Sequence, residues 1–169
     1  LNTPQTPLYD KSRHVFGLSQ AKESIRKSDY AVIVEGNLDV VSSHQVGITQ
    51  VVATAGTAMT EAHLKALVRL SPNARLAFDG DAAGLAATER AIPIAQKVGI
   101  DLTIIRLPEG SKDPDELIQE DPALWQKAID ESSGVIEWLL EQYTKREDMT
   151  SPMGKRHFTT AALAVVRAL

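Results

Sequence analysis

The sequence contains no cysteine, and this absence excludes several kinds of site. Disulfides, thiolate metal sites, cysteine-based zinc sites and cysteine nucleophiles are all excluded. The four histidines, His14, His44, His63 and His157, are scattered and lack a metal-ligand spacing such as H-E-x-x-H. These absences fit a metal site built from oxygen ligands, if the chain has one.

Long hydrophobic runs and an excess of positive charge are also missing. No apolar run approaches the roughly 18 residues of a membrane helix, and no signal peptide is recognisable, so we expect a cytoplasmic protein without a membrane partner. The 169 residues carry a net charge of −4, which argues against broad electrostatic capture of nucleic acid by this chain alone. The length favours one compact domain with a small appendage.

Strands and helices are predicted to alternate over most of the chain. The continuous apolar run at residues 30–34 is typical of a strand buried on both faces. Further strands are predicted at residues 50–54, 75–78 and 101–107. Helices are predicted at residues 19–27, 37–44, after 60, and at 82–98. This alternation predicts a parallel, Rossmann-like α/β sheet flanked by helices.

Several residues are predicted to begin, end or bend these helices. Ser19, Asn37 and Thr60 are predicted N-caps, and Gly99 is predicted to close the helix at 82–98. Pro93 is predicted to kink or divide that helix.

The last part of the sequence is predicted to be all helical. Helices are expected at residues 122–129, 135–146 and 153–168, with Trp125 and Trp138 buried in their core. We therefore expect a lead-in segment and helix at 1–28, an α/β domain at 29–120 and a small all-helical subdomain at 121–169.

Acidic residues follow three of the predicted strands. Glu35 follows the first strand, Asp79 and Asp81 the third, and Asp113 and Asp115 the fourth. In an open α/β sheet, ligands bind at the edge formed by the carboxyl ends of the strands, where these acids are expected. Two carboxylates about 4 Å apart repel by roughly 4 kcal/mol at an effective dielectric constant of 20, so converging acids need a counter-charge. Mg²⁺ supplies one and prefers carboxylates, waters and substrate phosphates. Helix capping explains Asp81 equally well when that residue is taken alone.

Other motifs fit these residues less well. An EF-hand beginning at Asp79 fails because Ala83 and Arg90 stand at ligand positions. A haloacid-dehalogenase-type phosphatase stays open, although Ala83 stands where that family has Thr or Val. No G-x-G-x-x-G is present, so dinucleotide binding has no support.

The acidic and glycine blocks, taken together in order, resemble a known family. The blocks are Glu35-Gly36, Asp39-Val40, Gly56-Thr57, Asp79-Gly80-Asp81-x-x-Gly84 and Asp113-Pro114-Asp115-Glu116. They resemble the Toprim domain, in the version found in bacterial DnaG-type DNA primases. The lead-in at residues 1–7, with Lys11 and Gly17 beyond it, is similar to the segment that precedes this domain in primases. The resemblance assigns the Toprim domain to residues 29–120.

This resemblance implies a nucleotidyltransferase that makes short RNA primers for DNA replication and is inactive or weakly active as an isolated fragment. Asp79, Asp81, Asp113 and Asp115 would hold Mg²⁺, or Mn²⁺ in its place. Glu35 would complete the cluster as a metal ligand or as a base near the attacking hydroxyl, and Glu35, Asp79 and Asp81 would be the catalytic residues. The implied partners are a single-stranded DNA template, ribonucleoside triphosphates and, in the full-length protein, the replicative helicase.

Two lysines are weaker candidates for contacts with nucleotides or nucleic acid. These are Lys11 in the lead-in and Lys112 before the Asp-Pro-Asp-Glu block, although a solvated lysine explains Lys112 more simply. Asn37 departs from the family, which usually has an aromatic residue after Glu-Gly. The alternatives are a Toprim nuclease, which hydrolyses nucleic-acid phosphodiesters, and a Toprim binding module without catalytic function.

Overall fold

The structure is a computed structural model that describes residue 6 and residues 9–78, 82–108 and 110–167. Four helices and four strands alternate first: α1 (Leu18–Ser28), β1 (Ala31–Val34), α2 (Asn37–Gln45), β2 (Val51–Ala53), α3 (Glu61–Leu67), β3 (Asn73–Ala77), α4 (Ala82–Val98) and β4 (Asp101–Ile104). The chain continues through α5 (Pro114–Glu120), α6 (Pro122–Asp130), β5 (Ser133–Gly134), α7 (Val135–Arg146) and α8 (Pro152–Arg167). A 3₁₀ turn, η1, covers Lys11–Arg13.

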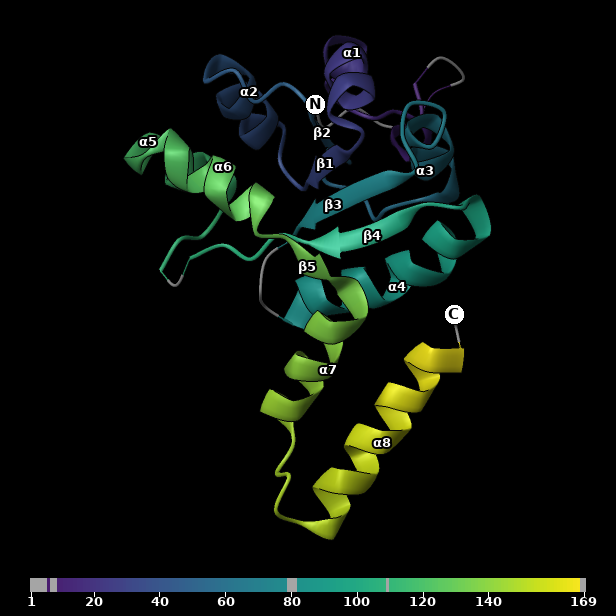
Figure 1. Cartoon of the computed structure of the whole chain (residues 1–169). Coiled ribbons are helices and arrows are strands. Elements are labelled where there is room, and N and C mark those ends of the chain that lie inside the picture. Colours follow the sequence, from purple (N-terminus) through teal and green to yellow (C-terminus); the bar gives the residue numbers. More distant parts are fainter. Residues whose placement is uncertain (1–5, 7–8, 79–81, 109, 168–169) are drawn as a thin grey trace.

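The strands of the described ranges form one sheet in the order β2-β1-β3-β4-β5. The strands β1 to β4 are parallel, and β5 pairs antiparallel with β4. The predicted parallel α/β sheet is confirmed, with this short antiparallel strand added. Because β1 to β4 run in the same direction, their carboxyl ends lie along one edge of the sheet (Figure 1).

Alternating side chains of the strands point to opposite faces of the sheet. Ile33 of β1 packs into a core formed with α1, α3, α4 and α7. Val32 and Val34 pack into a second core formed with α2, α5 and α6. The run at 31–34 is therefore apolar throughout because both faces of β1 are covered.

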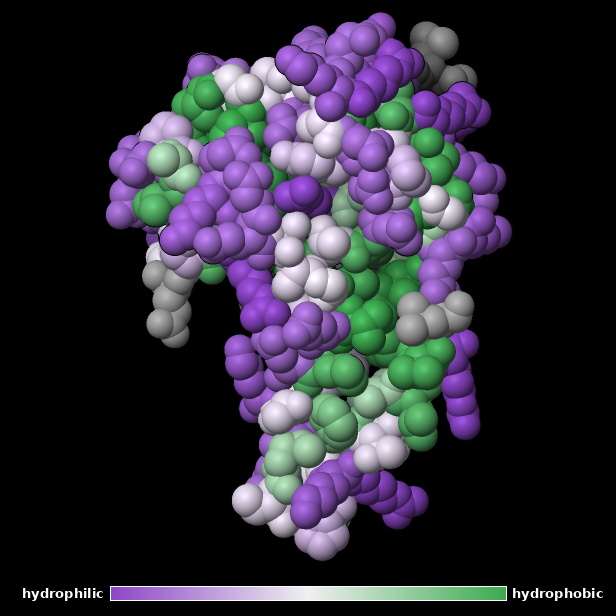
Figure 2. All heavy atoms as spheres, viewed as in Figure 1, coloured by the Kyte–Doolittle hydropathy of each residue, from purple (hydrophilic) through white to green (hydrophobic). Residues whose placement is uncertain are grey.

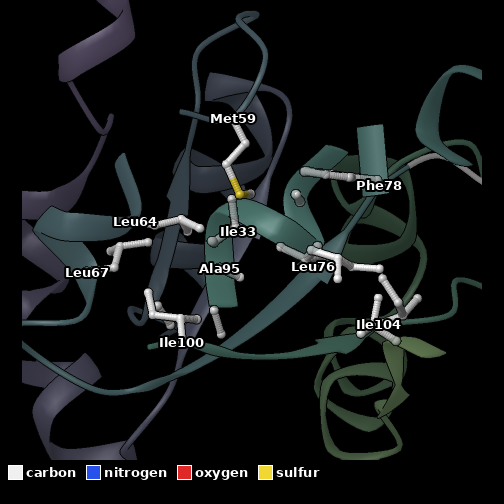
Figure 3. Packing of buried hydrophobic residues seen from close by; sticks show 14 of the residues in the cluster. Ile33, Met59, Leu64, Leu67, Leu76, Phe78, Ala95, Ile100 and Ile104 are labelled. Atoms are coloured by element: carbon white, nitrogen blue, oxygen red, sulfur yellow. The ribbon is translucent and has the colours of Figure 1, made fainter. Parts of the chain in front are cut away.

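The first of these cores is shown in Figure 3. Ile33 and Leu76 come from neighbouring strands, and Leu64 of α3 and Ala95 of α4 pack against them. Burying a leucine or isoleucine side chain completely contributes about 1.5–3 kcal/mol to folding, so this layer holds α3 and α4 on the sheet.

Two of the predicted helix boundaries are confirmed. Thr60 caps α3, and its Oγ1 accepts a hydrogen bond from the His63 N–H at 3.2 Å. Gly99 follows α4 with a φ of 79°, which glycine adopts without strain. Pro93 lies inside α4, which continues across it as a single helix, so the predicted division is wrong.

Two other predicted caps are wrong by one or two positions. The N-cap of α1 is Gly17, with a φ of 79°, and not Ser19. The N-cap of α2 is Gly36, and Asn37 is the first helical residue. In both cases a glycine at the bend precedes the polar residue that was expected to cap.

Three elements differ from the predicted pattern. The strand β3 begins at Asn73, two residues before the predicted start at residue 75. The helix α5 was not predicted, although Asp113 caps it and Pro114 occupies its first position, where proline is favoured. The strand β5 was not expected at all, because its two residues carry no recognisable pattern.

The helices after β4 pack on different parts of the molecule. Trp125 and Ile129 of α6 are buried on the second face of the sheet, whereas Trp138 and Leu139 of α7 belong to the first core. The burial predicted for both tryptophans is confirmed. The helix α7 runs away from the sheet, and α8 runs back beside α7 in the opposite direction (Figure 1).

Hydrophobic residues reach the surface around α7 and α8, whereas hydrophilic ones cover most of the upper half (Figure 2). Over the described part of the chain, none of the helices combines the length and apolar character needed to span a bilayer.

Candidate metal and nucleotide site

Four carboxylates line one cavity at the carboxyl edge of the sheet. Glu35, Asp39, Asp113 and Asp115 surround a space of about 500 Å³, which we call the acidic cavity. Glu35 follows β1 directly, Asp39 lies on α2, and the other two begin α5. The structure therefore brings three predicted site residues, Glu35, Asp113 and Asp115, to the same cavity.

Asp113 and Asp115 are positioned by the start of α5. Asp113 Oδ1 accepts a hydrogen bond from the Glu116 N–H at 2.8 Å and so caps the helix. The Ser42 hydroxyl donates to Asp115 Oδ1, and Gln119 Nε2 donates to Asp115 Oδ2 at 3.2 Å. Both oxygens of the Asp115 carboxylate are thus oriented by neighbouring side chains.

Asp39 belongs to one of the sequence blocks that carry the family resemblance, but it was not predicted as a site residue. Its Oδ1 accepts from the Asp115 N–H at 3.2 Å, and its Oδ2 accepts from the Gly36 N–H at 3.1 Å. The side chain is 7% exposed. Its place three residues after Gly36, at the N3 position of a predicted helix where an acid can bind the N-cap amide, is the signal that could have identified it.

The electrostatic surroundings of Asp39 favour a counter-charge. Burial raises the pKa of the Asp39 carboxyl, and the charges of Asp113 and Asp115 act in the same direction. The two backbone hydrogen bonds oppose this increase without cancelling it. A cation near Asp39 would lower the cost of keeping these carboxylates ionised.

The positioning of Asp39 is supported from the second face of the sheet. The Ser43 hydroxyl donates to the Asp39 carbonyl oxygen at 2.6 Å. The Trp125 indole N–H donates to Ser43 Oγ at 3.1 Å, and both side chains are fully buried. The helix α6 thus braces α2 at the turn that carries Asp39.

Glu35 lies between two cavities. It is exposed at the end of β1 and also lines a second space of about 270 Å³, together with Thr57, Phe78 and Arg90. Phe78 is the first residue after β3, so this second space adjoins the β3–α4 connection.

Asp79 and Asp81 belong to that connection and lie outside the described residues. Their predicted roles as catalytic and metal-binding residues stay predictions. Within the described ranges, no three acidic or imidazole groups are close enough together to form a metal site as they stand.

The two predicted lysines lie beside the acidic cavity in different places. Lys11 lines a pocket of about 260 Å³ with His14 and Phe16, and this pocket shares Asn37 and Ala55 with the acidic cavity. Lys112 lines another cavity, formed by the β4–α5 connection and α7.

The sequence of this chain is similar to those of known proteins. The model of the family described as Toprim-like matches residues 32–118. The DNA primase of Synechocystis sp. is 35% identical over 178 aligned residues, which include the whole of this chain and 28% of that primase. The chain thus spans little more than a quarter of the length of this curated relative.

Solved structures of primases agree over the whole chain. The RNA polymerase domain of Mycobacterium tuberculosis primase DnaG has a TM-score of 0.84 and 31% identity, and the match covers 100% of this chain and 55% of that one. A DnaG primase catalytic domain bound to ssDNA has a TM-score of 0.82 and 29% identity, with 100% of this chain and 56% of that chain covered. The chain belongs to the Toprim-like family, and the relatives that it matches along its whole length are bacterial DNA primases of the DnaG type.

Proposed function

We propose that this chain is the part of a DNA primase that holds the divalent cation and the nucleotide phosphates during synthesis of RNA primers. The observation that carries the proposal is the acidic cavity, where four carboxylates from separate segments of the chain meet at the sheet edge. Asp79 and Asp81 follow β3 in the sequence, and we propose that they complete the same cluster.

The donor set suits Mg²⁺, or Mn²⁺ in its place. Carboxylate oxygens are the ligands that these ions prefer, and the described residues that line the acidic cavity offer neither sulfur nor imidazole. Burial first, and then the charges of Asp113 and Asp115, raise the pKa of the Asp39 carboxyl, and a nearby cation would favour its ionised form. Asp39, Asp113 and Asp115 would hold one such ion, and Glu35 with Asp79 and Asp81 would hold another.

The roles of the residues follow from this arrangement. When bound, Mg²⁺ neutralises charge on the triphosphate oxygens, which is the main requirement of phosphoryl transfer. Glu35, exposed beside both cavities, would orient the attacking 3′-hydroxyl or accept its proton. Lys11 would contact phosphates from the lead-in side of the acidic cavity.

The proposed substrates are ribonucleoside triphosphates, and the proposed template is single-stranded DNA. The similar catalytic domain that was solved with ssDNA bound supports the template. The replicative helicase is the proposed partner of the full-length protein. Because the chain covers 28% of a curated primase, we expect little or no primer synthesis from this chain alone.

Calorimetric titration with Mn²⁺ tests this function. The double variant Asp113→Asn with Asp115→Asn should bind Mn²⁺ at least about tenfold more weakly than the wild type, because two ligands are lost. A matched control with the same change in charge is Glu120→Gln with Asp130→Asn, on the exposed sides of α5 and α6. The control should bind Mn²⁺ as the wild type does.

Two results would contradict the proposal. Equal Mn²⁺ affinity of the wild type and the Asp113/Asp115 variant would remove the acidic cavity as the metal site. Cleavage of single-stranded nucleic acid by the wild type with Mn²⁺ would instead favour a Toprim nuclease.

A further inference from the structure

A cavity of opposite charge lies on the other side of the β4–α5 connection. It has a volume of about 380 Å³, and its described lining includes Phe78, Arg106, Lys112, Trp138, Gln142 and Lys145. We call it the lysine cavity. Its described lining contains three cationic side chains and no carboxylate, in a chain whose net charge is −4.

One of the three cations is already neutralised. The Arg106 guanidinium binds both carboxylate oxygens of Glu141 at 2.8 and 2.9 Å, and its Nε donates to Ser133 Oγ at 3.2 Å. This arrangement fixes α7 against the end of β4. Both oxygens of Glu141, the acid one turn before Lys145, are thus bound by Arg106, and the Lys145 ammonium acts on Glu141 only through its charge, without a direct ion pair.

The two lysines are the available charges of this cavity. Among the described residues, neither Lys112 nor Lys145 forms an ion pair, and both are exposed. Phe78 and Trp138 are largely buried and form an apolar wall beside them. Two ammonium groups without a direct ion pair, next to an apolar wall, suit a sugar phosphate whose sugar or base packs on that wall.

The position of the lysine cavity relative to the acidic cavity indicates what carries the phosphate. Lys112 lines the lysine cavity, and the next residue, Asp113, lines the acidic cavity. Consecutive Cα atoms are about 3.8 Å apart, and phosphates follow one another every few ångströms along a nucleic-acid strand. One strand can therefore reach from the acidic cavity into the lysine cavity across this connection.

From this juxtaposition we infer that the lysine cavity binds a backbone phosphate of the nucleic-acid strand whose end lies at the acidic cavity. The inference rests on the proposed function, since it assumes that a nucleotide occupies the acidic cavity. A free nucleoside triphosphate offers the same phosphate chemistry, so the experiment has to separate a strand from a monomer.

Fluorescence anisotropy with a labelled single-stranded oligonucleotide, in EDTA and at several salt concentrations, provides the test. The full 169-residue chain with Lys112→Gln and Lys145→Gln should bind about tenfold more weakly at low salt, and its salt slope should be smaller by about 1.4, as expected for two lost phosphate contacts. The matched control is Lys22→Gln with Lys27→Gln on the exposed side of α1, which changes the net charge equally.

Each other outcome would overturn the inference. Equal weakening by the two double variants would show a long-range effect of net charge and no site. Weaker binding of ATP with unchanged oligonucleotide binding would assign the cavity to a free nucleotide. Absence of oligonucleotide binding by the wild type at low salt would exclude the strand altogether.

A separate readout keeps the failure of the proposed function distinguishable. Mn²⁺ affinity is measured on the same lysine variant and should equal that of the wild type, because neither lysine lines the acidic cavity. If the wild type binds no Mn²⁺ while the oligonucleotide results are as expected, the metal proposal and the placement of the strand's end at the acidic cavity both fail, whereas the lysine cavity stands as a strand-binding site.

Discussion

The backbone N–H of Asp115 donates to Asp39 Oδ1 at 3.2 Å and joins residues 76 positions apart in the sequence. The same carboxylate accepts from the Gly36 N–H at 3.1 Å through Oδ2. Asp39 thus fixes the start of α5 relative to the end of β1. This one side chain therefore helps to set the relative positions of Glu35, Asp113 and Asp115.

Ser42→Ala should weaken metal binding more than it weakens the fold. The Ser42 hydroxyl orients Asp115 by donating to its Oδ1, and loss of such a support lowers metal affinity by about tenfold or more. The expected loss of unfolding free energy is about 1 kcal/mol, since a single half-buried hydrogen bond disappears. Mn²⁺ calorimetry and urea unfolding measure the two effects, with the exposed Ser19→Ala as control. Unchanged Mn²⁺ affinity in Ser42→Ala would show that Asp115 needs no such support.

Ser43→Ala should destabilise the fold by about 1–3 kcal/mol, because the buried Trp125 indole N–H loses its acceptor. In the background of Trp125→Phe, which lacks this donor, the same substitution should cost about 1 kcal/mol less. Urea unfolding of the two single variants and the double variant gives this coupling energy. Additive effects would mean that the hydrogen bond between Trp125 and Ser43 contributes nothing to α2.

The sequence predicts the parts of this fold that depend on local patterns. The apolar run at 31–34, the cap at Thr60 and the glycine after α4 each carry their own signal, and all three appear in the structure. An aspartate before a proline at the start of α5 is a helix-cap signal too, but the acids there were interpreted as metal ligands and no helix was predicted. Both interpretations describe Asp113, which caps the helix and lines the acidic cavity.

Other features depend on contacts that no local pattern records. The strand β5 consists of two residues held by pairing with β4, in which Gly134 pairs with Thr103 and Ser133 pairs with Ile104. The role of Asp39 becomes visible only when folding brings the Asp115 N–H to it. Ser42 and Trp125 are ordinary helix residues in the sequence and acquire their roles through α5 and α2.

Gly36→Ala should disturb the site directly. A Cβ atom at this position would lie 2.7 Å from Asp39 Oδ2, so the carboxylate has to move. We expect a loss of about 1–3 kcal/mol in unfolding free energy and weaker Mn²⁺ binding.

Gly47→Ala is the matched control for that substitution. Its φ of 88° makes alanine strained by about 1 kcal/mol, but no atom lies within 4 Å of the added Cβ. Gly47→Ala should therefore lose stability while keeping the Mn²⁺ affinity of the wild type. Equal Mn²⁺ affinity of both variants would show that the packing of Gly36 against Asp39 does not affect the site.

Stability in acid should depend on Glu61, which joins α3 to α4. Hydrogen bonds from Lys65 and Lys97 lower the pKa of the Glu61 carboxyl from 4.5 to about 2. Because the folded-state pKa is lower than the unfolded one, the stabilisation is present above pH 4.5 and is lost as the pH falls towards 2. The difference in urea midpoint between the wild type and Glu61→Gln should shrink over this range. A difference that is constant with pH would contradict the role of these ion pairs.

The most direct test of the central claim is anomalous diffraction from a crystal of this chain soaked in Mn²⁺. We expect an anomalous peak in the acidic cavity, within coordination distance of oxygens from Asp39, Asp113 or Asp115. A fully soaked crystal without a peak there, in which Asp39 still accepts from the Gly36 and Asp115 amides and Asp113 still caps α5, would contradict the account.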